Sequence, residues 1–289
     1  MLSLSNLLDL YLVQRADLRS LPAQRAAFER HVVPALGAVP VTALKRSQIA
    51  AMLDHCATRA GPVMADRTLA YLRAALNWYE ARTDDWRSPL VRGMARAGAR
   101  ERTRVLDDCE LRSVWTATAD GAPFSRLVRV LLLTGQRRGE VAGMIWSELD
   151  LAGRLWTIPE ARFKSGQAHM VPLSEPVLEL LWVEPWGSAS PRPGRYLFGT
   201  TGGLRPLSGF GKPLVRLHAR SRTRGWRLHD LRRTVRTRMA ALRVPHAVAE
   251  LVLGHGKRGL ARVYDQYSYL PEMREALERW SQELARIVG

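Results

Sequence analysis

Leu228-His229-Asp230-Leu231-Arg232-Arg233-Thr234 and, further along the chain, Leu253-Gly254-His255 are the two stretches that decide the fold. Tyr264 follows the second stretch, nine residues after its histidine. His229 and Arg232, at i and i+3, share one face of a predicted helix. A tyrosine close to cationic groups can become a nucleophile toward a phosphodiester. These two stretches therefore direct attention to phosphate chemistry.

The charge of the chain indicates a polyanionic partner. The 289 residues hold 44 Lys and Arg against 27 Asp and Glu, a formal net charge of +17. The basic excess occurs in both halves of the chain, which fits a long polyanion because each neutralised phosphate releases counterions. Some proteins are simply soluble and basic, but an excess this large favours nucleic acid. Only four of the cations are lysines, a skew that either bidentate phosphate contacts or codon bias explains.

Cysteine usage and hydropathy bear on the compartment. The two cysteines, Cys56 and Cys109, are too few for a disulfide framework, and no Cys/His cluster has zinc spacing. The N-terminus has no basic region followed by an apolar run, and no apolar run of membrane-spanning length follows. We therefore expect a reducing location, the bacterial cytoplasm, with no membrane partner.

The first part of the chain, residues 1–86, is predicted to be all-helical. Apolar residues recur at i, i+3 and i+4 over residues 3–14, 20–33 and about 63–82. Ser20 can cap the second of these helices, and Ser47 can cap a further helix between the last two. The helix over 20–33 is expected to end before Pro34. Basic residues fall mostly opposite the apolar stripes, either as a solvated face or as a DNA-facing one.

Residues 87–104 have the composition of a linker. Six arginines alternate there with Ser88-Pro89, Gly93 and Gly98, and large apolar residues are few. Such a segment can lie along a phosphate backbone. A capping-box-like pattern, Asp107-x-x-Glu110, then starts a new helix. The domain boundary is placed within this linker.

The second part, residues 105–289, is predicted to be mainly helical with one strand-like patch. A near-continuous apolar run, Leu127–Leu133, indicates a buried helix. Two strands, Leu155–Ile158 and His169–Leu173, are joined by a polar turn that contains Lys164. Loops are expected over 184–213. Helical patterns resume around 207–220, 229–243, 246–253 and 271–288.

Phosphodiester transesterification needs fixed cations, an in-line nucleophile and a proton donor for the leaving oxygen. Arg137 follows the buried apolar run in the order Thr134-Gly135-Gln136-Arg137-Arg138-Gly139-Glu140, and Lys164 stands at a strand turn from which it can reach a groove. Each has an ordinary alternative: Arg137 can form a structural ion pair with Glu140, and a hairpin lysine is commonly solvent-exposed. Because these residues occur together in one chain and in one order, the functional interpretation of each gains weight.

That order resembles the tyrosine recombinases, also called phage integrases. It runs Thr-Gly-x-Arg-x-Gly-Glu, hairpin Lys164, His229-x-x-Arg232, Leu253-Gly254-His255 and Tyr264. The pattern His31-x-x-Pro34-x-Leu36-Gly37 is similar to that family's small core-binding domain. The resemblance covers nearly the whole chain. It implies a mainly α protein with an N-terminal helical core-binding (SAM-like) domain and a C-terminal mixed α+β catalytic domain that carries a small antiparallel sheet.

The resemblance implies a role for each matching position. Arg137 and Arg232 match the arginines that clamp the scissile phosphate, Lys164 the lysine that protonates the leaving 5′-hydroxyl, and His255 the residue that hydrogen-bonds the phosphate. His229 matches the residue thought to assist proton transfer, and Tyr264 the nucleophile that forms a 3′-phosphotyrosyl link. Because arginines neutralise the charge, no metal and no cofactor is expected.

Several questions stay open at the level of sequence. Tyr267 and Tyr269 are further candidate nucleophiles, although the spacing from His255 favours Tyr264. Many integrases carry an additional N-terminal domain that binds arm-type DNA sites, and this sequence begins almost directly with the core-binding helices. The terminal helix, 271–288, can fold back on its own domain or dock on a neighbouring protomer, with a slight preference for the exchange.

The expected activity is site-specific cleavage and rejoining of double-stranded DNA. The resemblance implies a homo-tetramer on paired sites, a monomer or weak oligomer without DNA, and accessory DNA-bending or directionality proteins. Two alternatives are a type IB topoisomerase-like enzyme that relaxes DNA as a monomer and a catalytically silent DNA-binding protein of the same fold. The core-binding domain argues against the first, and the complete residue set argues against the second.

Overall fold

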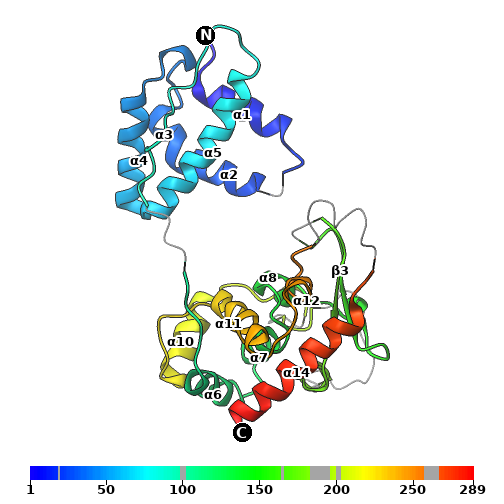
Figure 1. Ribbon diagram of the computed structural model, residues 1–289. Helices are drawn as coiled ribbons and strands as arrows, with labels where there is room; N and C mark the ends of the chain where they lie inside the picture. The colour runs from blue at the N-terminus through cyan, green and yellow to red at the C-terminus, as the bar shows by residue number, and fades with distance from the viewer. Residues whose placement is uncertain (19, 98–101, 164–165, 183–195, 200–202, 257–266) are drawn as a thin grey trace. The chain divides into compact units, whose positions relative to one another are not determined.

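The computed structural model describes residues 1–18, 20–97, 102–163, 166–182, 196–199, 203–256 and 267–289. The chain forms two compact units, Met1–Glu101 and Arg102–Gly289 (Figure 1). Each unit has a hydrophobic core of its own. In the described part of the chain, no helix combines the length and the apolar character that a membrane span requires.

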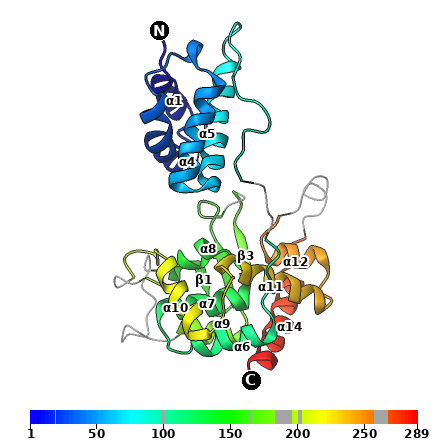
Figure 2. The same cartoon turned by 90° about the vertical axis from the view of Figure 1, so that its left-hand side faces the viewer.

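The first unit is a bundle of helices, as the sequence predicts. Its long helices bury an apolar stripe each, with Leu4, Leu53 and Leu72 fully buried at the centre. The most extensive contact between helices of this unit is that of Arg46–Ala60 with Pro62–Glu80 (Figure 2). The elements are α1 (Leu4–Gln14), α2 (Leu21–Ala27), the π-helical turn η1 (Phe28–Val32), α3 (Val33–Leu36), the 3-10 turn η2 (Val41–Ala43), α4 (Arg46–Ala60) and α5 (Pro62–Glu80).

The second helical run does not end before Pro34, so that predicted boundary is wrong. The helix passes through Pro34 to Leu36 by widening into the π-helical turn Phe28–Val32. Proline has no N–H for the carbonyl four residues earlier and its ring collides with that carbonyl, and a wider turn relieves both problems. In the wider turn the Val33 N–H donates to the Phe28 carbonyl.

Two helix starts differ from the predicted caps. The fourth helix begins after Lys45, whose N–H donates to Gln48 Oε1 at 2.9 Å, so Ser47 is not its cap. Ser20 precedes α2 but makes no side-chain cap bond to it. The Gln48 side chain satisfies the N–H of Lys45, the residue before the helix, so the helix begins at Arg46 without a serine cap.

Most of the predicted linker packs against the first unit. Trp86 and Leu90 contact its core and Met94 is buried in it. The Arg96 side chain donates to Asp54 at 2.8 Å, and its N–H donates to Asp66 at 2.5 Å. Residues 87–97 therefore pack against the helical unit. The few apolar residues of this stretch fall where the bundle can cover them.

The second unit is helical around one small sheet, which confirms the predicted fold class. Asp107 caps its first helix by accepting from the Glu110 N–H at 2.9 Å, as the capping pattern predicts. The elements are α6 (Asp108–Ala117), α7 (Pro123–Thr134), α8 (Arg138–Ala142), the 3-10 turn η3 (Trp146–Glu148), β1 (Leu149–Asp150), β2 (Leu155–Ile158), β3 (His169–Pro172), α9 (Glu175–Trp182), α10 (Gly211–Ser221), α11 (Leu228–Ala241), α12 (His246–Val252) and α14 (Leu270–Val288).

The sheet is antiparallel in the order β1-β2-β3. The two predicted strands pair with Ile158 opposite His169, and the short β1 was not predicted. Two residues carry too little alternation to indicate a strand. The register places His169 and Val171 on the buried side of the sheet, with Met170 exposed.

The terminal helix folds back on its own unit. Its apolar stripe, which includes Met273, Leu277 and Leu284, lies in the second core, and Trp280 Nε1 donates to the Leu132 carbonyl of α7 at 2.7 Å. In the single chain the helix thus lies on its own unit, and its exchange with a neighbouring protomer stays a prediction. The helix packs against α6, α7 and α12 of the same unit (Figure 1).

Candidate active site

The start of α11 is fixed by the buried carboxylate of Asp230. Asp230 accepts the Arg227 N–H at 2.8 Å and forms an ion pair with Arg102 at 2.9 Å, and it also pairs with Arg233. Burial alone would raise the pKa of this carboxyl, but these bonds hold it below its ordinary value. The carboxylate thus locks the first turn of the helix, from which His229 and Arg232 project.

Arg232 is almost completely buried and joins two distant segments. Its Nη1 donates to the Gly135 carbonyl at 3.0 Å, and its Nη2 donates to the Leu253 carbonyl at 2.5 Å. The same Nη2 lies 3.0 Å from His255 Nε2. Burial lowers the pKa of Arg232 to about 10, and the nearby charge of Arg137 adds to this effect. The guanidinium still carries its charge at neutral pH, so a fixed cation stands at the end of α7.

Arg137 lies between α7 and α8. Its Nη1 donates to Glu140 Oε1 at 2.8 Å, and its N–H donates to Glu140 Oε2 at 2.9 Å. The ordinary alternative, a structural ion pair, is therefore present. The guanidinium also lies 5.3 Å from the centre of the Phe163 ring and keeps a quarter of the side chain exposed. Glu140 positions this arginine while leaving its outer donors available.

His255 is oriented by a carboxylate from α12. Its Nδ1 lies 2.5 Å from Glu250 Oε2, and its main-chain N–H donates to the Glu250 carbonyl at 2.9 Å. Burial would raise the pKa of the Glu250 carboxyl, but hydrogen bonds from Arg236 and His255 hold it lower. When Nδ1 donates to this carboxylate, Nε2 becomes the acceptor that the Arg232 guanidinium requires. Glu250 therefore selects one tautomer of His255.

His229 completes the group of described site residues. His229 is exposed, yet partial desolvation lowers the pKa of His229, followed by the charges of Arg232 and Arg233. The charge of Arg137 acts in the same direction, which reflects its proximity. His229 is therefore a neutral imidazole at pH 7, able to accept or donate a proton. We call Arg137, His229, Arg232 and His255 the cationic cluster.

The structure thus brings together four of the six predicted site residues. They come from the loop after α7, the start of α11 and the turn after α12, which the hydrogen bonds of Arg232 to Gly135 and Leu253 join. Lys164 and Tyr264 lie outside the described residues. An arrangement of two guanidinium groups and two imidazoles suits a phosphate whose charge grows during the reaction.

Gly254 is needed where α12 ends beside the sheet. Its φ of +67° lies in the left-handed region, and an added Cβ would overlap the Phe163 ring and lie 3.1 Å from His169 Nε2. Only glycine allows this approach without strain. The close contact explains why a glycine precedes His255 in the Leu-Gly-His stretch.

His169 is a site neighbour that sequence reasoning missed. Its ring stacks on Phe163 with centroids 4.7 Å apart, and only 8% of the residue is exposed. Burial lowers the pKa of His169 to about 4, against a hydrogen bond to the Val252 carbonyl that raises it, and the charges of Arg232, Arg137 and His255 also lower it. The available signal was its place at a buried register position of a predicted strand. Glu250, also missed, had no such signal.

The chain belongs to the phage integrase family. The model of the Phage integrase family matches residues 104–269, more than half of the chain. The match spans every residue of the cationic cluster, and the predicted resemblance is confirmed.

Relatives with curated descriptions are integrases of prophages and phages. The prophage integrase IntZ of Escherichia coli (strain K12) is 28% identical over 177 residues, which cover 59% of this chain and 42% of that protein. The prophage integrase IntF of the same strain is 27% identical over 200 residues, 66% of this chain and 41% of that protein. The chain therefore spans about two fifths of the length of these relatives.

Solved structures share the fold across both units. A λ integrase fragment, residues 75–356, bound as a dimer to a COC′ core site, has a TM-score of 0.68 at 19% identity, covering 89% of this chain and 96% of that one. The Tn1549 transposon integrase in complex with transposon right end DNA has a TM-score of 0.69 at 15% identity, covering 97% and 100%. At these identities the likeness is one of fold.

Proposed function

We propose that this protein is a site-specific DNA recombinase that cleaves and rejoins double-stranded DNA through a 3′-phosphotyrosyl intermediate. The observation that carries the proposal is the network Arg232–His255–Glu250, which fixes one buried guanidinium and one histidine tautomer beside Arg137 and His229. The solved structures of similar fold named here are complexes with DNA, and a further one is a λ integrase tetramer on a Holliday junction. Double-stranded DNA is the partner, bound by a homo-tetramer on paired sites.

The reaction needs no cofactor and no metal. The Tyr264 hydroxyl attacks phosphorus, its oxygen forms the new P–O bond, and the bond from phosphorus to the 5′-oxygen breaks. Arg137 and Arg232 neutralise the charge on the non-bridging oxygens. When DNA is bound, a His255 ring that carries a second proton, on Nε2, donates a hydrogen bond to one of these oxygens. Lys164 supplies a proton to the leaving 5′-oxygen, and His229 takes the tyrosyl proton. Attack by another 5′-hydroxyl reverses these steps and joins a new strand.

The two units divide the work. Residues 1–86 form the core-type DNA-binding domain and residues 105–289 the catalytic domain, with the arginine-rich stretch 87–104 between them. Before it meets DNA, the protein is a monomer or weak oligomer. Accessory DNA-bending or directionality proteins set the outcome. The action takes place in the bacterial cytoplasm.

Tyr264 is preferred over its neighbours as the nucleophile. The Tyr267 ring lies edge-on to Tyr269 with centroids 4.8 Å apart, and half of the residue is exposed. Partial desolvation and then the Glu272 carboxylate raise the pKa of Tyr267 above its ordinary value. A nucleophilic tyrosine needs the opposite shift. Tyr267 is therefore poorly suited to attack phosphorus.

A covalent-trapping experiment tests the proposal. The protein is incubated with a nicked duplex that carries its attachment site, so that the cleaved strand is lost and the adduct accumulates on a denaturing gel. We expect an adduct with the natural protein and with Tyr267→Phe, and none with Tyr264→Phe. The absence of any adduct with the natural protein would favour a silent DNA-binding protein, and relaxation of any supercoiled plasmid by a monomer would favour a topoisomerase.

A further inference from the structure

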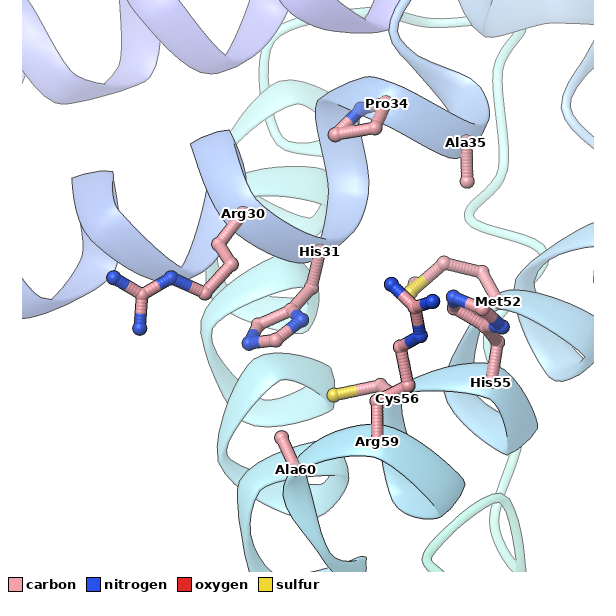
Figure 3. A pocket seen from close by; sticks show the side chains of 9 residues that line it. All are labelled: Arg30, His31, Pro34, Ala35, Met52, His55, Cys56, Arg59 and Ala60. Atoms are coloured by element: carbon pink, nitrogen blue, oxygen red, sulfur yellow. The ribbon is translucent and has the colours of Figure 1, made fainter.

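A groove in the first unit has a chemistry that the cationic cluster does not use. It lies between the π-helical turn with α3 on one side and α4 on the other, and has a volume of about 660 Å³ (Figure 3). In the figure, His31, Cys56 and Arg59 project into the space between the helices, whereas Arg30 extends away from it. The lining residues are Arg30, His31, Pro34, Ala35, Met52, His55, Cys56, Arg59 and Ala60.

The groove is formed by a feature that is rare in helices. Pro34 forces the turn Phe28–Val32 into the π-helical form, and His31 is carried on that turn. π-helical turns are uncommon and often occur at functional sites. His31 and Pro34 belong to the pattern that the sequence resemblance rests on, yet the catalytic proposal gives neither of them a task.

The charges around the groove are of one sign. No aspartate or glutamate lines it, and the lining residues include two arginines and two histidines. Asp54, which directly precedes His55 on α4, is paired instead with Arg96 at 2.8 Å. Within the described part of the chain, no three His, Cys, Asp or Glu side chains form a metal-binding group. The groove therefore suits an anion and not a cation.

Neighbouring positive charges affect the pKa of His31. Burial lowers the pKa of His31, and the charges of Arg30 and His55 lower it further. An anion in the groove would reverse these last two effects and favour the charged form of His31. The floor, Met52 and Cys56, is buried and apolar, and an apolar floor beneath cationic groups fits a sugar–phosphate better than a free ion.

We propose that this groove binds a phosphate of the DNA backbone through Arg59, His31 and His55, and that protons strengthen the contact. The proposal rests on the proposed DNA substrate, but it concerns a site other than the catalytic one. As the pH falls, protonation of His31 adds positive charge to that of Arg59, and a phosphate in the groove favours this charged form. The affinity for DNA therefore rises as the pH falls from 7.5 to 6.

The salt dependence of binding tests the phosphate contact. Full-length protein carrying Tyr264→Phe is titrated against a short labelled duplex of arbitrary sequence over a range of salt concentrations. Because each phosphate contact contributes about one unit to the slope of log K against log salt, Arg59→Ala should reduce that slope by about one. Arg59→Lys should keep it. Arg112→Ala, an exposed arginine of α6, makes the same change in net charge outside the groove and serves as the control.

The histidines report occupancy directly. With seven histidines in the chain, the imidazole proton signals of His31 and His55 can be assigned by substitution and followed by NMR. Upward shifts of both pKa values with duplex DNA support the proposal, whether or not inorganic phosphate at equal ionic strength reproduces them. Shifts with inorganic phosphate and none with DNA overturn it, as does the absence of any shift.

Two further results complete the test. A slope that Arg59→Ala leaves unchanged also overturns the proposal, provided that thermal unfolding shows the variant to be folded. Removing both imidazoles with His31→Ala and His55→Ala should weaken the pH dependence of DNA affinity between pH 6 and 7.5, leaving the part that comes from histidines elsewhere, such as His229 and His255. An unchanged pH dependence overturns the proposal. The binding measurements use Tyr264→Phe protein throughout, so they do not depend on strand cleavage. A failure of the proposed recombinase activity is detected separately, by the trapping experiment.

Discussion

At the scale of single residues, Glu250 orients the His255 ring, a role that its position in the sequence does not indicate. It lies five residues before His255, accepts from Nδ1 of that ring and also pairs with Arg236 at 2.7 Å. Its carboxylate fixes both the ring orientation and the tautomer that faces Arg232. No pattern in the sequence marks it, because the contact is made by the turn that ends α12.

Replacing this carboxylate tests its orienting role. Glu250→Gln removes the charge and allows the His255 ring to take either tautomer, so single-turnover formation of the covalent adduct should slow by about 10- to 100-fold, the range found for groups that orient functional histidines. Glu283→Gln breaks an exposed pair with Arg286 on α14 and serves as the control. A Glu250→Gln rate equal to that of the natural protein would contradict the assigned role.

The buried His169 makes stability depend on pH. Its pKa is about 4 in the folded chain, and the ordinary value is 6.5. Between these values the unfolded chain binds a proton that the folded chain does not, so the free energy of unfolding falls as the pH drops from 6.5 to 4. The full loss is about 3 kcal/mol by the relation between pKa and free energy.

Denaturant unfolding at pH 7.5 and pH 5 measures this dependence. The His169→Gln variant should lose less free energy of unfolding between the two pH values than the natural protein does. His246→Gln, an exposed histidine of α12, should behave like the natural protein. Equal losses in all three proteins would show that His169 titrates normally in the folded state.

At the scale of elements, the turns between helices carry the site. Gly135 ends α7 with φ of +66°, and an added Cβ there would meet Leu253 at 2.9 Å and Val235 at 3.0 Å. The end of α7, the start of α11 and the end of α12 therefore approach closely. This approach is what allows Arg232 to reach the carbonyls of both Gly135 and Leu253.

Gly254 gives a matched test of the turn that precedes His255. Gly254→Ala places a methyl group against Phe163 in a left-handed backbone conformation, which should cost about 1–3 kcal/mol of unfolding free energy and displace His255. At Gly256 an added Cβ meets no atom of the described residues, so Gly256→Ala should cost far less. Denaturant unfolding and adduct formation measure the two effects. Similar losses in both variants would argue against the packing described.

Most helices and both longer strands follow from apolar periodicity. The exceptions have local physical causes: Pro34 widens a helix instead of ending it, Gln48 replaces Ser47 in starting α4, and β1 is too short to alternate. Arg137, His229, Arg232 and His255 could be predicted from the sequence because their spacing repeats a family pattern. Glu250 and His169 could not, since each acts through a contact between distant segments.

At the scale of the whole molecule, the chain has two hydrophobic cores. Leu72 is fully buried in the first and Leu127 in the second. The stretch predicted as a free linker contributes Met94 to the first core. The functional division is thus supported by separate packing, with Arg102 and Arg104 anchored in the second unit by Asp230 and Glu110.

Core substitutions should act on one unit at a time. Leu72→Ala should cost about 2–5 kcal/mol and speed amide exchange in α1, α4 and α5, and Leu127→Ala should do the same for α7 and α11. Hydrogen exchange followed by mass spectrometry resolves these segments. Faster exchange throughout the chain in either variant would show that the two cores unfold as one.

The position of the covalent link tests the central claim most directly. Protein trapped on a nicked duplex is digested with nuclease and trypsin, and the fragment from Val263 to Arg274, which contains Tyr264, Tyr267 and Tyr269, is sequenced by tandem mass spectrometry. We predict that the residual nucleotide is attached to Tyr264 through a 3′-phosphate. A nucleotide on another residue, or a 5′ linkage, would contradict the account.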